Sequence, residues 1–571
     1  HGALPANDDT RLHWYHVMSL SPYLWQFMAR VVAVSEPSQR NGTSSGALMQ
    51  RQTTADDLDP GTPDEVEIRT AAREPQQDPT VGIAVTPSGV FGDPPHRLVT
   101  IGDSLTHGFQ SNAVFRTDLS YPAIVAWELG CFDQFRFPRY DGHGGLPLNL
   151  EMLLRDLEDR FGPTLDLWEI PSAIFRVHRI MDEVEDYWER GAGSVVPSSP
   201  LINHNLAVYG WDLRDALSKT AAVCRRQVEH PKDNVSPLRQ LVQNNNDRAA
   251  LRVYPSNPGR ANMTVFDAAR ALGAEAGDHA EAGIETLVVA LGANNALGSV
   301  AGLRVAWSGP GYDHPEAKQA FTVWRPSHFT AELNRVAAEV RTIEARHVIW
   351  CTVPHVTIAP VTRGVGSKVH ASSRYFPYYT RPWVSDGTFN TNKHRYLTAA
   401  QARAVDSAID QYNDAIVAVV ADARSAGRDW RVLDLAGTLD RLAQRRYIDH
   451  PEARPDWWQP YQLPAELLGV SPVPDARFLT SDGSRRIAGG LFSIDGVHPT
   501  TTGYGIFAQE LINVMHGAGV EFRHANGAPR TGPIRVDFAR LLRRDTLLSR
   551  PPAYLRGGLD ALGWLDELGL L

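Results

Sequence analysis

A serine in a short glycine-bounded segment is the first residue of this chain that could do chemistry. The segment reads Gly-Asp-Ser-Leu-Thr-His-Gly from Gly102 to Gly108, with Ser104 at its third position. It follows the apolar run 98–101, which predicts a buried strand, and ligand sites in open parallel sheets lie where strands end. Ser104 is therefore a candidate nucleophile. The alternative is a serine that only caps a helix.

A candidate base for this serine lies near the other end of the chain. Residues 495–499 read Asp-Gly-Val-His-Pro and precede a helical pattern that continues to Ile512. A serine hydroxyl needs a base to take its proton, and the base needs a third group that orients it. Asp495 and His498 could supply both. The spacing alone also fits a turn with a solvated aspartate.

Two further strand ends carry residues that could stabilise an oxyanion. One apolar run ends at Gly210, and the run 287–291 is followed by Gly-Ala-Asn-Asn, in which Asn294 is the first asparagine. Acyl transfer places negative charge on the former carbonyl oxygen, and donors aimed at that oxygen stabilise the transition state. A glycine N–H and an asparagine amide could serve. Taken singly, each also fits an ordinary turn residue.

The elements that must position these residues alternate along the chain. Short apolar runs predict strands, and helical patterns at residues 329–344 and 399–424 lie between them; the runs are 98–101, 206–209, 287–291, 348–351 and 432–435. This alternation predicts an α/β fold with a mainly parallel sheet of about five strands. Long stretches predict insertions that cap or line a site, near residues 131–200, 300–325, 355–395 and 437–490.

The order of the four strand ends resembles that of the GDSL (SGNH) hydrolase family. The resemblance covers residues from about 96 to 516. It implies a flavodoxin-like three-layer α/β/α fold and a serine esterase or lipase that works through an acyl-enzyme. In that family Ser104 would be the nucleophile, His498 its base and Asp495 the partner of the histidine.

The same resemblance implies an oxyanion hole built from Ser104, Gly210 and Asn294, with no cofactor or metal ion. The family's third motif usually places aspartate after the asparagine, whereas this chain has Asn295. The substitution puts the local support of that loop in question. The expected substrate is a small-molecule or lipid ester, whose acyl chain and alcohol the sequence leaves open.

Two other functions stay open at this stage. An acyltransferase could use the same site with an alcohol or sugar as acceptor, and a lipid- or carbohydrate-binding protein could keep the fold without catalysis. Aromatic residues of the insertions could line an acyl or sugar site, although ordinary core positions are favoured: Trp324, Tyr375, Tyr378, Tyr379, Trp383, Trp457 and Trp458.

The two ends of the chain fall outside the resemblance. Residues 1–95 predict an N-terminal extension that is partly a loose linker, because much of it is polar and rich in Pro and Gly. Residues 42–46 fit a Gly-x-Ser-x-Gly elbow but lack the strand that such an elbow needs. Residues 517–571 predict a C-terminal helical extension, with leucines at helical spacing after residue 554 that favour packing over membrane anchoring.

Composition and charge bear on partners. The net charge of −9 argues against nucleic acid, and no apolar stretch is long enough for a membrane span. The three distant cysteines indicate neither a disulfide framework nor a zinc site. His107, His143 and His314 predict surface or loop histidines rather than metal ligands. The chain begins with His1, so we expect a processed or truncated N-terminus; a cytoplasmic location is favoured over secretion, and the oligomeric state stays open.

Overall fold

The computed structural model describes residues 58–86 and 92–555, apart from residues 165, 167, 230–241, 255–256 and 276–281. The chain divides into two units, one of His1–Gln52 with Leu165–Ser172 and one of Thr53–Thr164 with Ala173–Leu571. Of the first unit, the structure describes only the few residues that lead into helix α6 (Ile170–Glu189). The larger unit contains every predicted site residue.

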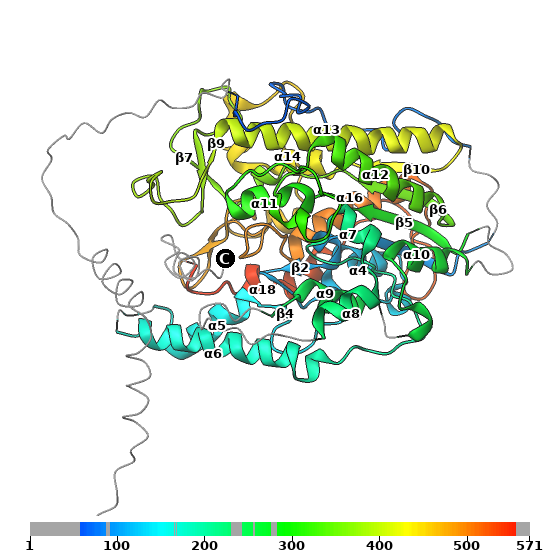
Figure 1. The fold of residues 1–571 in the computed structure, drawn as a ribbon, viewed down its shortest axis with the longest axis horizontal. Coiled ribbons are helices and arrows are strands. Elements are labelled where there is room, and N and C mark those ends of the chain that lie inside the picture. Colours follow the sequence, from blue (N-terminus) through cyan, green and yellow to red (C-terminus); the bar gives the residue numbers. More distant parts are fainter. Residues whose placement is uncertain are drawn as a thin grey trace, which may run out of the picture. The chain divides into compact units, whose positions relative to one another are not determined.

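A parallel sheet forms the centre of the larger unit (Figure 1). Its strands lie in the order β1 (His96–Gly102), β5 (Ile284–Ala290), β6 (Ala345–Cys351) and β10 (Trp430–Leu433). Nearly all their side chains are buried, as expected for a parallel sheet that is covered on both faces. The predicted α/β class with a parallel sheet is confirmed.

The expectation of about five strands is met only in part. The run 206–209 lies beside β1, but a single parallel bridge joins Thr100 to Asn205. Leu206 N–H donates to the Thr100 carbonyl at 2.8 Å, and Val208 N–H donates to the Gly102 carbonyl at 3.1 Å. Asn205 Nδ2 donates to the Thr106 carbonyl, and its Oδ1 accepts the Ala207 N–H. The sheet therefore has four strands and one irregular edge segment.

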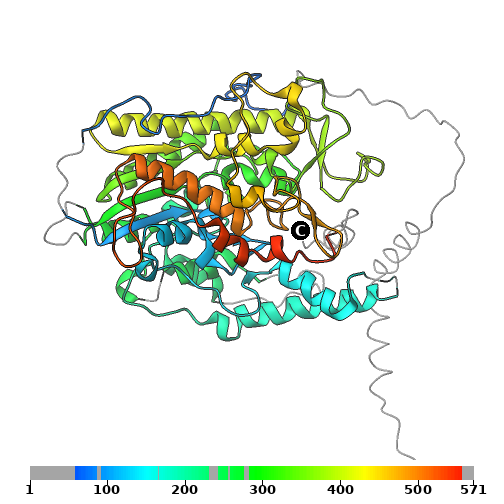
Figure 2. The same ribbon diagram turned by 180° about the vertical axis from the view of Figure 1, so that it is seen from behind.

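Helices lie on both faces of this sheet (Figures 1 and 2). On one face, α4 (Tyr121–Glu128) and α16 (Thr501–Gly517) pack on each other and on alternate strand side chains, including Val288, Ile349 and Leu433. On the other face lie α12 (Pro326–Arg341) and α13 (Ala399–Ser425), which also pack together. The catalytic candidates sit where the strands end, between these layers.

The predicted long connections carry small elements of their own. The connection after α4 holds α5 (Leu150–Phe161) and α6, and that after β6 holds a three-stranded antiparallel sheet of β7 (Arg363–Val365), β8 (Tyr378–Thr380) and β9 (Leu397–Thr398). The connection after β10 holds α14 (Leu435–Leu442), a π-helical turn, β11 (Thr480–Ser481) and β12 (Arg486–Ala488). Four of the seven aromatic residues named above are buried: Trp324, Tyr375, Tyr379 and Trp458.

The described parts of the two extensions lie against the body. Arg73 forms a 3.0 Å ion pair with Asp434, and Val432 N–H donates to the Pro79 carbonyl, so this part of residues 58–86 lies beside the edge strand β10. Helices α17 (Phe538–Arg544) and α18 (Thr546–Ser549) follow α16. Most of the predicted leucine-rich helix and residues 1–57 lie outside the described residues. None of the described helices is both long and apolar enough to cross a membrane.

Candidate active site

Ser104 opens a very short helix that follows β1 directly. This helix is α3 (Ser104–His107), and the Asp103 carboxylate caps it by accepting the Leu105 N–H at 3.1 Å. At Gly102, the turn from strand to helix is so tight that a Cβ atom would collide with the Thr106 side chain. Burial raises the pKa of Asp103 to about 6. The sequence thus places Ser104 at the C-terminal end of β1, where its hydroxyl faces the site.

His498 and Asp495 reach this serine from the loop before α16. His498 Nε2 lies 2.8 Å from the Ser104 hydroxyl oxygen, and His498 Nδ1 lies 3.1 Å from Asp495 Oδ2. Ser104 and His498 are buried, with 6% and 8% of their surface exposed. The structure therefore brings together the three residues that the sequence suggested as nucleophile, base and orienting acid.

Both oxygens of the Asp495 carboxylate accept hydrogen bonds from backbone N–H groups. Oδ1 accepts the N–H groups of Val497 and His498, each at 2.8 Å, and Oδ2 accepts the Asn112 N–H at 2.9 Å as well as the histidine ring. Burial would raise the pKa of Asp495, but the imidazole and these hydrogen bonds hold it below its usual value. An ionised Asp495 accepts from Nδ1–H, which leaves Nε2 as the acceptor for the serine hydroxyl.

Asn112 is a site residue that the sequence analysis missed. It follows Ser111 in a two-residue turn between β2 (Phe109–Gln110) and β3 (Ala113–Val114). Both turn residues have left-handed φ angles, 52° and 61°, as the tight hairpin turns that join paired strands require. The turn directs the Ser111 N–H to the Ser493 hydroxyl and the Asn112 N–H to Asp495. A Ser-Asn pair is a weak signal for such a turn, because asparagine tolerates this conformation.

The predicted oxyanion-hole residue Asn294 bonds to the residue that follows the other, Gly210. Asn294 opens α11 (Asn294–Gly302), and its Nδ2 donates to the Trp211 carbonyl at 2.8 Å, next to Gly210. Gly210 has a φ of 76°, which places it in the left-handed region. Among the described residues, the backbone N–H groups of Ser104 and Gly210 find no protein acceptor, and no hydrogen bond links Ser104 directly to Gly210 or Asn294.

His107 connects α3 to the loop of Gly210, which corrects the expectation of a surface or loop histidine. It is fully buried, and its Nδ1 accepts the Tyr209 N–H at 3.1 Å. Its Nε2 must then carry the proton and donate to the Tyr140 hydroxyl at 2.8 Å. Burial lowers the pKa of His107 to about 3, so the ring stays neutral. His143 and His314 are exposed, as predicted.

The loop after Gly210 is supported from two sides. Asn295 is buried, and its Oδ1 accepts the Leu213 N–H at 3.4 Å at the start of α7 (Leu213–Ser218), so the asparagine at this position contacts the loop. From the predicted insertion at residues 300–325, Lys318 Nζ lies 2.6 Å from both Asp212 and Asp215. The sequence analysis gave no role to Lys318.

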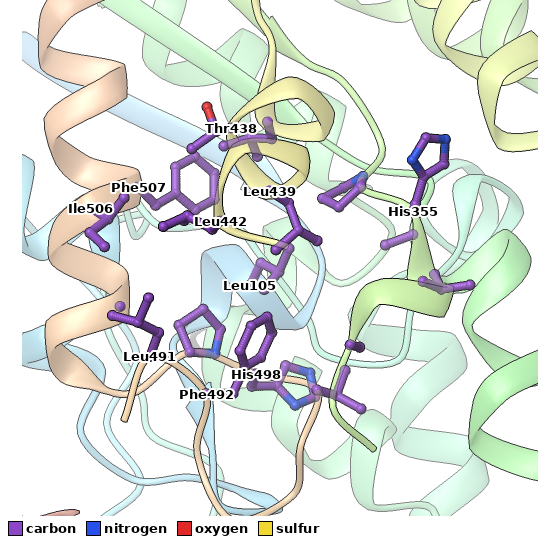
Figure 3. Close-up of a pocket in the computed structure, with 18 of the residues that line it drawn as sticks. Leu105, His355, Thr438, Leu439, Leu442, Leu491, Phe492, His498, Ile506 and Phe507 are labelled. Atoms are coloured by element: carbon purple, nitrogen blue, oxygen red, sulfur yellow. The ribbon is translucent and has the colours of Figure 1, made fainter. Parts of the chain in front are cut away.

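An apolar cavity of about 140 Å³ opens beside Ser104 and His498 (Figure 3). Leu105, Leu439, Leu442, Leu491 and Phe507 are among the side chains that line it. We call it the site cavity. Within the described residues, no group of three or more His, Cys, Asp or Glu side chains could hold a metal ion. The arrangement therefore offers a hydroxyl, a base with an oriented ring, unpaired backbone donors and a nonpolar chamber.

Comparisons with known proteins add nothing to this geometry: no family model matches the chain, and neither the curated proteins nor the solved structures include a match.

Proposed function

We propose that this chain is a serine esterase of the GDSL (SGNH) type, which hydrolyses carboxylic esters through an acyl-enzyme. The observation that carries the proposal is the hydrogen-bonded series from Ser104 through His498 to Asp495, with heavy-atom distances of 2.8 and 3.1 Å. Nucleophile, base and orienting acid in this geometry are the recognisable parts of acyl-transfer sites on unrelated folds.

The order of the sheet supports the same proposal. When the irregular edge segment is counted, the strands lie in the chain order second, first, third, fourth and fifth. This is the order of flavodoxin-like α/β folds, in which ligands bind where the strand order reverses. Ser104 follows the first strand, and Asn294 opens the helix after the third strand, β5, so both lie at the reversal.

The reaction would proceed in two halves. His498 Nε2 takes the hydroxyl proton while Ser104 Oγ forms a bond to the ester carbonyl carbon. Collapse of the tetrahedral intermediate breaks the bond to the alcohol, which leaves with the proton from His498. Water then attacks the acyl-enzyme with the same base, and the acid is released as the bond to Ser104 Oγ breaks.

Backbone and side-chain donors would stabilise the oxyanion in both halves. The unpaired N–H groups of Ser104 and Gly210 are two candidates. The Asn294 amide has two hydrogens, and one of them is used by the Trp211 carbonyl. The second hydrogen is the third candidate donor. Removal of one such donor costs about 3–4 kcal/mol of transition-state stabilisation.

A fluorophosphonate probe and a short-chain p-nitrophenyl ester test the proposal together. We expect covalent labelling at Ser104, and Ser104→Ala should abolish labelling and lower kcat by about 10⁴-fold or more. The exposed Ser372 provides a matched control, and Ser372→Ala should behave as the unmodified chain. A folded protein that neither labels nor hydrolyses the ester contradicts the proposal. If an added alcohol captures the acyl group faster than water does, the chain is an acyltransferase.

A further inference from the structure

The site cavity is suited to hydrocarbon. Apart from Ser104 and His498, its polar side chains are Thr438 and His355, and both are already engaged. The Thr438 hydroxyl donates to the Asp434 carbonyl at 3.0 Å, and His355 Nε2 lies 2.9 Å from Asp410. A sugar placed here would lose its hydrogen bonds to water without gaining protein partners, at a cost for each buried hydroxyl. An aliphatic chain carries no such cost.

The volume of the site cavity limits the length of the aliphatic chain that it can hold. Its volume is about 140 Å³. A cavity of about 150 Å³ lined by Leu, Ile and Phe side chains accommodates benzene. The site cavity therefore holds about six carbon atoms by the same measure.

A second cavity, of about 260 Å³, adjoins the first. We call it the rear cavity; Arg441, Tyr461, Asp475 and Arg477 contribute to its lining. It shares the side chains of Leu442 and Leu491 with the site cavity, whereas Ser104 and His498 line only the site cavity. These two leucines therefore form the wall between the reacting groups and the rear cavity.

The two leucines are held differently. Leu491 is buried, and its backbone is fixed by hydrogen bonds to Asp475 and Thr500 at 3.1 and 3.0 Å. Leu442 is only half-buried and is the last residue of α14, just before the π-helical turn. Removal of the Leu442 side chain is thus the simplest way to join the two cavities.

We propose that the site cavity binds the linear aliphatic chain of an ester, and that Leu442 and Leu491 end this chain at about six carbons. The inference deepens the proposed esterase function and rests on it for the position of the reacting carbonyl. The substrate class is then an ester with a short to medium aliphatic arm. Sugar groups would have to lie outside the cavity.

Binding measurements on an inactive variant test the site cavity independently of catalysis. Linear 1-alkanols of two to ten carbons are titrated into the full-length Ser104→Ala protein and followed by calorimetry. We expect affinity to rise about fourfold per methylene, since burial of one methylene contributes about 0.8 kcal/mol, and to level off near six carbons. Affinity that does not depend on chain length would overturn the inference.

The wall is tested by two alanine substitutions on one helix. Leu439 and Leu442 both lie on α14 and are both half-buried, but only Leu442 lines the rear cavity as well. In the Ser104→Ala background, Leu442→Ala should let affinity continue to rise up to about ten carbons. Leu439→Ala enlarges the site cavity without joining it to the rear cavity, so it should extend the limit by less. Leu442→Val gives a smaller opening if the alanine variant does not fold. An unchanged limit in folded Leu442→Ala or Leu442→Val overturns the role of the wall.

Kinetics distinguish the acyl chain from the alcohol chain. One series varies the acyl chain of p-nitrophenyl esters, and the other varies the alcohol of linear alkyl acetates. The series whose chain occupies the cavity should show kcat/KM rising about fourfold per methylene to about six carbons. Two flat series from an enzyme that hydrolyses the acetate overturn the inference and leave the esterase proposal intact. Absence of fluorophosphonate labelling overturns the esterase proposal, whatever the alkanols show.

Discussion

Asp495 has more hydrogen bonds than orientation of a histidine requires. Its two oxygens accept three backbone N–H groups and the ring of His498, and burial raises its pKa less than these contacts lower it. In the proposed mechanism, an acid fixed in this way cannot rotate away when Ser104 transfers its proton. Its charge can then stabilise the imidazolium that forms in the transition state.

Asp495→Asn tests this role. Asparagine keeps the shape of the side chain but loses the charge, and its amide can present a donor to His498 Nδ1. We expect kcat on a short-chain ester to fall by about 10⁴-fold with little change in KM. Steady-state kinetics measure both, and a thermal melt confirms the fold. A kcat within tenfold of the unmodified enzyme would mean that His498 is oriented by other groups.

The residues recognised from sequence are those whose type alone suggests chemistry. Ser104, His498 and Asp495 lie in short motifs at strand ends, and the structure brings these three together. His107 and Asn112 were not recognised, because their contributions depend on burial and on a left-handed turn. A neutral buried histidine has no sequence pattern of its own, and a backbone N–H donor carries no residue type at all.

At the scale of elements, three side chains from different segments hold the loop of Gly210, and one of them comes from the short helix after β1. His107 bonds to Tyr209 within the site, Asn294 bonds to Trp211, and Lys318 bonds to Asp212 from the connection between α11 and α12. The side chains of Lys318 and Asp212 are about nine-tenths buried. This predicted insertion therefore supports the loop in addition to covering the fold.

Lys318→Met should show that support. Loss of the ammonium leaves Asp212 without its cation and Asp215 with only Lys219, at 3.8 Å. Burial and repulsion by Asp215 already raise the pKa of Asp212 to about 6. Removal of one partner of a buried ion pair typically costs about 3–5 kcal/mol in the free energy of unfolding. We expect a loss of that size in urea denaturation, together with a lower kcat.

The exposed Lys393 is the matched control, because it lies in another long connection and forms no ion pair among the described residues. Lys393→Met should leave both the free energy of unfolding and kcat near their original values, and Lys318→Arg should restore part of the loss. Equal effects at the two lysines would mean that Lys318 does not support the loop.

Strands were easier to predict than the edge segment for a physical reason. The four regular strands are continuous apolar runs buried on both faces, which the sequence displays directly. The run 206–209 is equally apolar, but Asn205 uses its side chain on nearby backbone, and the chain turns at Gly210. Hydrophobic pattern predicts burial, whereas it does not show where regular strand pairing ends.

At the scale of the whole molecule, predicted insertions contribute charged groups to the interior. His355 follows β6 and lies between Asp410 of α13 and Asp440 of α14, at 2.9 and 3.4 Å. Arg446 from the π-helical turn pairs with Asp406 of α13 at 2.7 Å. All five side chains are almost fully buried. This network joins three segments that are far apart in the sequence, and no short motif could have predicted it.

Because of this network, we expect the free energy of unfolding to fall as the pH rises into the alkaline range. Burial alone would lower the pKa of His355, but three neighbouring carboxylates raise it to about 10. In the unfolded chain a histidine has a pKa of about 6.5, so the folded state binds the extra proton between these two values. The contribution to stability is therefore fully present below pH 6.5 and is lost as the pH rises toward 10, by at most about 1.4 kcal/mol per pH unit.

Urea denaturation at intervals between pH 6.5 and 9 measures this slope directly. We expect the free energy of unfolding to fall across the interval, and His355→Gln to make the dependence shallower even if the variant is less stable overall. His516, exposed on α16, provides the control, and His516→Gln should keep the original slope. Nuclear magnetic resonance gives a second reading, because the His355 ring in the folded protein should remain protonated up to pH 9. A His355 ring that titrates near pH 6.5 would show that the carboxylates around it do not act as a charged network.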